Sequence, residues 1–111
     1  MTTIRRDGRD PDHPILDQPW EYRIAELRYV VETSDQEGFI EMLLGRGSEV
    51  RRLRFSSPRG FSVDEGFEPE SYIGLQIVDV SGRQWEGIGV EVSCVENTAG
   101  LRFFARAVEA I

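Results

Sequence analysis

Apolar and polar residues alternate along most of this chain, and a period of two is typical of a half-buried β-strand. Six segments have the pattern: residues 23–31, 39–44, 50–55, 73–77, 88–94 and 101–107. In the first segment the apolar face consists of Ala25, Leu27, Tyr29 and Val31. The pattern therefore predicts a mostly β fold.

Short turns join most of these segments, for example at residues 33–38 and 45–48. They favour antiparallel hairpins, because a parallel connection needs a dozen or more residues. Only residues 56–72 are long enough to cross between sheets. We predict six antiparallel strands, in two three-stranded meanders that form a sandwich or a partly open barrel. One short helix is compatible with residues 36–44 or 105–111.

The segment 50–55 alternates less cleanly than the others. Leu53 and Phe55 share a face, whereas Val50 is out of phase with them. A β-bulge inserts one residue and shifts the phase of a strand. We therefore expect a bulge near Arg51 or Arg52.

The length of 111 residues corresponds to a single domain. Residues 1–19 contain Pro11, Pro14 and Pro19 together with alternating Arg and Asp, and few apolar groups. Proline lacks a backbone donor and resists regular structure. We therefore interpret residues 1–19 as a flexible leader and residues 20–111 as one β domain.

The charge limits which partners the chain can have. It holds 13 basic and 20 acidic residues, a net charge of −7, and every basic residue is Arg. Nucleic acids and anionic membranes attract basic proteins, so neither is expected as a partner. A basic protein partner would be attracted. The absence of a signal peptide or a long apolar run, together with the single cysteine, indicates the cytoplasm.

The residues that commonly perform catalysis are scarce. His13 is the only histidine and lies in the leader, and Cys94, the only cysteine, shares an apolar face with Val90 and Val92. A Ser-His-Asp, Cys-His or zinc site needs more of these residues on a rigid support. We therefore expect neither an enzyme nor a metal or cofactor site, and we expect Cys94 to lie in the core.

Two charged stretches follow each other in the middle of the chain. Residues 46–59 hold five arginines and one glutamate, and four acidic residues come after them: Asp64, Glu65, Glu68 and Glu70. The acidic residues match no calcium-binding pattern. We interpret them as a solvated loop that neutralises the arginines.

The strongest candidate for a binding site is the segment 79–87. It places Trp85 and Arg83, the residue types enriched at binding hot spots, beside Glu86 and Asp79 between glycines. In the alternative interpretation, Trp85 closes the open end of the sheets and Arg83 binds Asp79 or Glu86.

The segment 74–88, GLQIVDVSGRQWEGI, and the later LRFFAR of residues 101–106 resemble small uncharacterised bacterial proteins. Some of these are similar to immunity proteins of polymorphic toxin systems. The resemblance covers about the C-terminal third of the chain. It implies a cytoplasmic protein that binds and neutralises a toxin without catalysis, and it provides no active-site residue.

We therefore expect a non-catalytic protein-binding domain, an immunity-like inhibitor of a basic partner. Three alternatives stay open. A ligand-binding β-barrel requires a cavity lined by residues such as Phe39, Leu75 and Phe103. An enzyme that uses carboxylates alone requires at least two of them in one cleft. A homodimer would pair exposed sheet edges.

Overall fold

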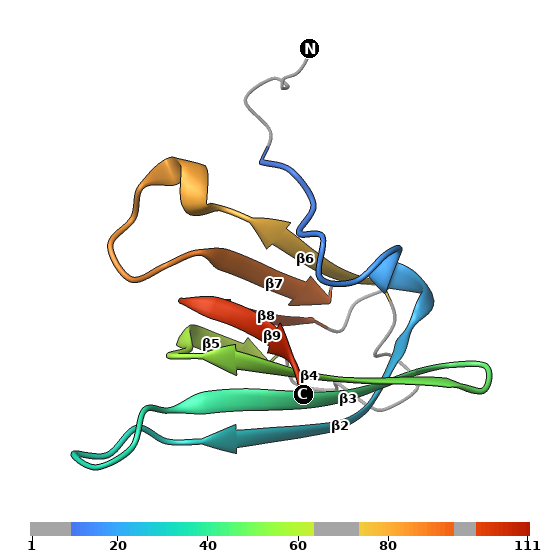
Figure 1. Ribbon diagram of the computed structural model, residues 1–111, viewed down its shortest axis with the longest axis horizontal. Coiled ribbons are helices and arrows are strands. Elements are labelled where there is room, and N and C mark those ends of the chain that lie inside the picture. Colours follow the sequence, from blue (N-terminus) through green and yellow to red (C-terminus); the bar gives the residue numbers. More distant parts are fainter. Residues whose placement is uncertain (1–9, 64–73, 95–99) are drawn as a thin grey trace.

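The computed structural model describes residues 10–63, 74–94 and 100–111, which form two four-stranded antiparallel sheets (Figure 1). The first sheet has the order β2 (Arg23–Val30), β3 (Phe39–Arg46), β4 (Glu49–Ser56) and β9 (Ala107–Ala110). The second has the order β5 (Arg59–Val63), β8 (Leu101–Ala105), β7 (Val90–Cys94) and β6 (Leu75–Asp79). Two 3-10 turns, η1 (Pro19–Glu21) and η3 (Ser81–Arg83), precede β2 and follow β6.

The predicted mostly β architecture is confirmed, and the described residues form eight strands in place of six. The meanders β2–β3–β4 and β6–β7–β8 match the prediction, and the two sheets do not form a closed barrel. Each meander gains a fourth strand, β9 or β5, that the sequence pattern did not indicate. The helix considered at residues 36–44 or 105–111 is wrong, because these segments contain β3 and β9.

Two chain segments change sheet at one shared corner. β4 continues through Ser57 into β5, and β8 continues through Arg106 into β9. Since β4 pairs with β9 and β5 pairs with β8, both segments bend at the same place. Ser57 has a left-handed backbone with φ 49°, and the Arg106 N–H donates to the Ser56 carbonyl at 2.8 Å. Bends of this kind form the corners of packed sheets.

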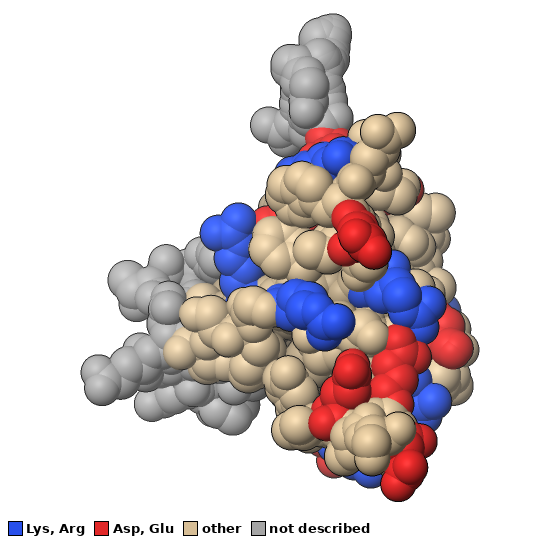
Figure 2. Space-filling view, turned by 90° about the vertical axis from the view of Figure 1, so that its left-hand side faces the viewer, with Lys and Arg blue, Asp and Glu red and all other residues tan. Residues whose placement is uncertain are grey.

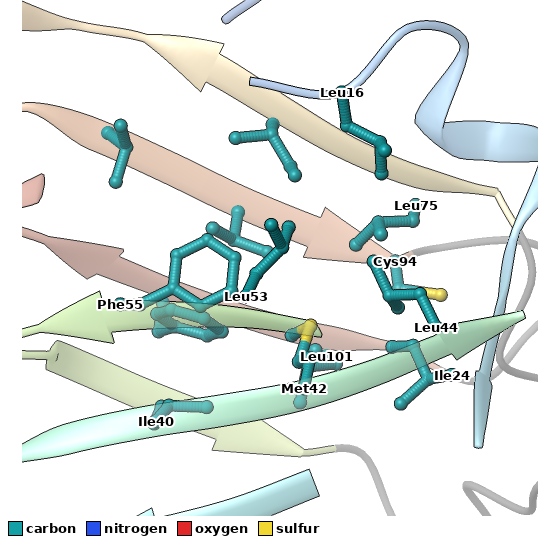
Figure 3. Close-up of a cluster of buried hydrophobic side chains, with 14 of the residues drawn as sticks. Leu16, Ile24, Ile40, Met42, Leu44, Leu53, Phe55, Leu75, Cys94 and Leu101 are labelled. Carbon is teal, nitrogen blue, oxygen red and sulfur yellow. The ribbon is translucent and has the colours of Figure 1, made fainter. Parts of the chain in front are cut away.

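The core lies between the sheets and consists of their inward-facing apolar residues (Figure 3). Phe55 of β4 meets Phe103 of β8 edge to face, with ring centroids 5.3 Å apart. Both rings are fully buried, so this pair joins the two sheets. Cys94 is also fully buried, as its apolar neighbours predicted.

The bulge of the first sheet is in β2 rather than in β4. The β2–β3 register shifts between Ile24 and Glu26, whereas β3 and β4 pair without interruption from Phe39 opposite Ser56 to Arg46 opposite Glu49. The bulge predicted near residues 51–52 is therefore wrong. Val50 is out of phase simply because it faces solvent.

The bulge also changes which residues of β2 are buried. Ile24 is buried and Leu27 is half-buried, whereas Ala25 and Tyr29 are exposed, as is Val31 beyond the strand. The continuous apolar face expected for residues 23–31 is therefore interrupted.

The part of the expected leader that the structure describes, residues 10–19, packs against the second sheet. Asp12 forms a β-bridge with Val78, and the His13 N–H donates to the Ile77 carbonyl at 2.9 Å. Leu16 is buried in the core. This segment therefore covers the outer edge of β6. No helix within the described ranges is long and apolar enough to span a membrane.

Candidate functional site

The candidate residues lie in the loop that joins β6 to β7, and backbone hydrogen bonds close this loop on itself. The Val80 N–H donates to the Gly89 carbonyl at 2.9 Å, and the Ile88 N–H donates to the Trp85 carbonyl at 3.1 Å. Gln84 adopts a left-handed backbone with φ 59°. The loop is thus held by its own main chain as well as by its ends.

Gly89 fixes the base of the loop against the second sheet. Its N–H donates to the Ala105 carbonyl at 2.9 Å. A Cβ at this position would lie 2.5 Å from the Arg106 carbonyl oxygen, closer than real Cβ contacts. Only glycine lets the loop approach β8 this closely.

Asp79 shapes the start of the loop. Its Oδ1 accepts hydrogen bonds from the Ser81 N–H at 2.9 Å and from the Ser81 hydroxyl at 2.6 Å. These bonds, that of the hydroxyl above all, lower the pKa of Asp79 below its usual value. A carboxylate that caps the next residues in this way stabilises a turn.

Trp85 lies on the outer face of the second sheet, beside Phe104 of β8. The two rings meet edge to face, with centroids 5.7 Å apart and planes at 76°. The guanidinium carbon of Arg83 lies 4.7 Å from the centroid of the Trp85 ring. Even so, 45% of Trp85 is exposed. We call Arg83, Trp85 and Phe104 the Trp85 patch.

Arg83 is held by acidic residues outside its own loop. Its Nε lies 2.7 Å from an Asp10 carboxylate oxygen, and its terminal nitrogen is 3.6 Å from Glu91. Glu91 in turn binds Arg102 at 2.8 Å. The guanidinium that stacks on Trp85 is therefore fixed by two carboxylates.

The four residues selected from the sequence have different surroundings. Arg83 and Trp85 contact each other, and Asp79 caps the turn that precedes them. Arg83 pairs with Asp10 and Glu91 rather than with Asp79 or Glu86. Glu86 is exposed, and its carboxylate makes no ion pair with any residue that the structure describes. Trp85 does not close the end of the sheets.

Phe104 is the residue of the patch that the sequence analysis missed. Leu101, Phe103 and Ala105 are the buried face of β8, so Phe104 points outward. An aromatic residue on the polar face of a strand was the signal available. The strand order then places it beside the loop, which the sequence could not indicate.

The outer face of the first sheet is occupied by a network of charges. Glu41 is only 9% exposed, and Arg54 binds it with Nε at 2.9 Å, while Arg28 reaches it at 3.3 Å. Both guanidinium groups also stack on Phe39, at 4.6 and 5.7 Å. The bonds from Arg54 lower the pKa of Glu41 despite its burial.

Two more arginines of the basic stretch, Arg46 and Arg51, are paired as well. Arg46 binds Glu21 at 3.0 Å and Glu49 at 2.7 Å, and Arg51 also pairs with Glu49. The acidic run expected to neutralise this stretch, residues 64–70, lies outside the described residues. The partners found are glutamates of the first sheet and of η1.

A third cluster closes the corner where the strands change sheet. Glu37 accepts hydrogen bonds from the Ser57 hydroxyl at 2.5 Å and from Arg106 at 2.8 to 3.0 Å. These bonds lower the pKa of Glu37, with Ser57 as the main cause. Beside this cluster is a surface hollow of about 610 Å³, which Arg54 and Arg106 help to line. Both arginines are already bound to glutamates.

The face toward which loops 31–38 and 80–89 extend mixes both signs of charge, with acidic side chains gathered at its lower end (Figure 2). Glu32, Asp35 and Glu37 belong to the lower loop. Arg106 neutralises Glu37. Glu32 and Asp35 still make this end of the molecule mainly acidic.

The cavity expected for a ligand-binding barrel is not lined by the three residues named for it. Leu75 and Phe103 are fully buried in the core, whereas Phe39 lies on the opposite face of its sheet beneath two arginines. The three side chains therefore share no cavity.

His13 is tied into the fold, because its Nδ1 accepts a hydrogen bond from the Ile15 N–H at 3.0 Å. Across residues 10–63, 74–94 and 100–111, no three side chains of the metal-ligating types gather in one place. Two serine hydroxyls donate to carboxylates: Ser57 to Glu37, which is already bound to Arg106, and Ser81 to Asp79, which caps the turn.

Comparison of the chain with models of protein families, with curated proteins and with solved structures finds no match. Fold and surface must therefore define the class of protein. The chain is an all-β domain of two four-stranded antiparallel sheets. It carries an aromatic patch on the outer face of the second sheet.

Proposed function

We propose that this chain is a non-catalytic domain that binds another protein through the Trp85 patch. One observation carries the proposal: Trp85 is held between Arg83 and Phe104, yet 45% of it is exposed. Tryptophan and arginine dominate binding hot spots. A side chain ordered before binding loses little entropy when a partner docks, so more of its contact energy becomes affinity.

The charge of the chain supports a basic partner. The net charge is −7, and the arginine of the patch is already paired with Asp10 and Glu91. Glu86, next to Trp85, is exposed. An excess of acidic groups speeds the approach of a basic protein, and added salt weakens this effect.

Residues 74–88 and 101–106 resemble small bacterial proteins, some of which are similar to immunity proteins, and this resemblance supports a specific form of the function. Such a protein would cover the active surface of a basic toxin by occlusion. Both segments belong to the second sheet and its loop, where the Trp85 patch lies.

The test uses the full-length protein as bait in lysate of the native host, with Trp85→Ala and Trp20→Ala as variants. Trp20 is a matched control, because it is 46% exposed and lies in η1, at the opposite end of β6 (Figure 1). We expect wild type and Trp20→Ala to capture the same stoichiometric partner and Trp85→Ala to lose it. Equal capture by Trp85→Ala would contradict the proposed site.

The immunity-like form has its own test, in which the captured partner is produced alone and with the inhibitor. We expect the partner to be basic and to arrest growth. Wild type should restore growth, whereas Trp85→Ala should not. A harmless or acidic partner would exclude this form and leave protein binding in place.

A further inference from the structure

The two sheets have four edge strands in the described part of the chain, and three are protected in different ways. β9 has only four residues, and the outer edge of β6 is covered by residues 11–13. β5 has Gly60 at φ 65° and an irregular register between Arg59 and Ser62. Short strands, covering segments and bulges all prevent pairing between molecules.

β2 differs from these three edges. It has eight residues, and no described strand pairs with its outer side. Its bulge is confined to Ala25, so the segment from Glu26 to Val30 pairs regularly with β3. A regular edge presents a row of backbone donors and acceptors to solvent.

The side chains along this edge have a complementary order. Glu26 and Arg28 lie on the outer face of the sheet and are exposed. The Arg28 side chain is 63% exposed even though it contacts Glu41. On the other face, Leu27 is half-buried and Tyr29 is 42% exposed.

We propose that β2 pairs antiparallel with β2 of a second copy of this chain, about a two-fold axis at Leu27. In a symmetric antiparallel pair, the two-fold axis passes between the same residue of the two strands. Only every second residue directs its backbone N–H and C=O groups outward, so outward-directed residues of the two strands must lie opposite each other. With the axis at Leu27, Glu26 of each copy lies opposite Arg28 of the other. An axis at Glu26 or at Arg28 would place like charges opposite each other, which is unfavourable.

The apolar face fits the same register. The regular segment begins at Glu26, after the bulge at Ala25, and the Tyr29 ring packs edge to face on Phe61 of its own copy, with centroids 5.2 Å apart. Leu27 meets Leu27 at the axis. The first sheets of the two copies then form one continuous eight-stranded sheet with an isologous interface. The Trp85 patch lies on the other sheet, so this proposal is independent of the proposed function.

Sedimentation velocity of the full-length protein over a range of concentrations tests the interface. We expect wild type to reach twice the monomer mass. Glu26→Arg and Arg28→Glu should each weaken dimerisation about tenfold or more, because each places two like-charged pairs across the axis. Arg28→Glu also places a carboxylate opposite Glu41, whose bond to Arg54 does not involve Arg28, and circular dichroism checks that both variants fold.

A mixture of the two variants provides the decisive measurement. In the heterodimer the arginine introduced by Glu26→Arg faces the glutamate introduced by Arg28→Glu, and across the axis the native Arg28 faces the native Glu26. An equimolar mixture should therefore regain the dimer that neither variant forms alone. Glu32→Arg, which changes an exposed acidic residue beyond the end of β2, is the control and should dimerise like wild type.

Three results would overturn the proposal. The first is a wild-type protein that stays monomeric at every concentration. The second is a dimer that survives Glu26→Arg, which would place the interface elsewhere. The third is a mixture of variants that stays monomeric, which would exclude this register.

Discussion

The outer faces of the two sheets use the same contact, an arginine stacked on an aromatic ring, for different results. On the first sheet, Arg28 and Arg54 both stack on Phe39, and Glu41 binds both of them. On the second sheet, Arg83 stacks on Trp85, and 45% of Trp85 is exposed.

The difference lies in where the counter-charge is placed. Glu41 is in the central part of its sheet, between its two arginines. It therefore binds both guanidinium groups, and these groups cover Phe39. Arg83 is bound from the side by Asp10 and Glu91, which fixes the guanidinium without covering Trp85. The first arrangement closes a face, and the second leaves an ordered aromatic anchor exposed to solvent.

Exchanging the two rings for alanine should separate binding from stability. We expect Trp85→Ala to weaken partner binding by about 2 kcal/mol or more and to lower the free energy of unfolding by about 1 kcal/mol or less. Phe39→Ala should lower the free energy of unfolding by about 1 to 2 kcal/mol and leave binding unchanged. Urea unfolding and titration with the captured partner measure both. If Trp85→Ala and Phe39→Ala weakened binding equally, the two faces would not differ in function.

Neutralising Glu41, between its two arginines, should lower the free energy of unfolding more than neutralising an exposed glutamate of the same sheet. Glu41→Gln leaves Arg28 and Arg54 side by side without their shared carboxylate, so we expect the free energy of unfolding to fall by about 1 to 2 kcal/mol. Glu109→Gln is the control, because Glu109 is exposed and lies opposite Arg54 in the register. Urea unfolding that shows equal losses for both variants would mean that burial of Glu41 adds nothing.

The same network predicts a specific response to acid. The folded protein holds the pKa of Glu41 below its usual value of 4.5, mainly through the bonds from Arg54. The stabilisation is therefore complete above pH 4.5 and is lost as the pH falls through the folded pKa. The difference in unfolding free energy between wild type and Glu41→Gln should shrink below pH 4.5. A difference that stays constant down to pH 3, roughly one to two units below the pKa of an ordinary carboxyl, would contradict the assignment.

The smallest effect is expected at the start of the binding loop. Asp79→Ala removes the cap on Ser81 and should lower the free energy of unfolding by about 0.5 to 1 kcal/mol. In a Trp20→Phe background, where Trp85 is the only tryptophan, acrylamide should quench the fluorescence of this variant more strongly. Glu86→Ala changes a carboxylate of the same loop and should leave quenching unchanged. Identical quenching in both variants would show that Asp79 does not order the loop.

Alternation predicted six strand segments because inward and outward residues differ in those segments. It missed β5, where all five residues are exposed, so no buried face marks the strand. It missed β9 because residues 107–110, Ala-Val-Glu-Ala, have no strand pattern of their own and pair with β4 only after β8 has turned the corner. It placed the bulge in β4 because an exposed valine was interpreted as a shift in phase.

The candidate site was predicted only in part. Composition identified Arg83 and Trp85 as binding residue types, and the structure brings them into contact. It could not indicate Asp10, which is 73 residues from Arg83 in the chain, or Glu91, which reaches Arg83 only because β7 turns back beside the loop. Nor could it show that residues 10–13 are ordered, because their partner is the edge of β6.

The sequence by itself determined the β class, the two meanders, the buried Cys94 and the scarcity of catalytic residue types. These follow from residue counts and from a local period of two, which need no knowledge of the neighbouring strands. The tertiary structure alone decided the corner at Ser57 and Arg106, the covering of Phe39 and the exposure of Trp85. Each depends on which distant strands lie side by side, and that is set by the packing of the whole core.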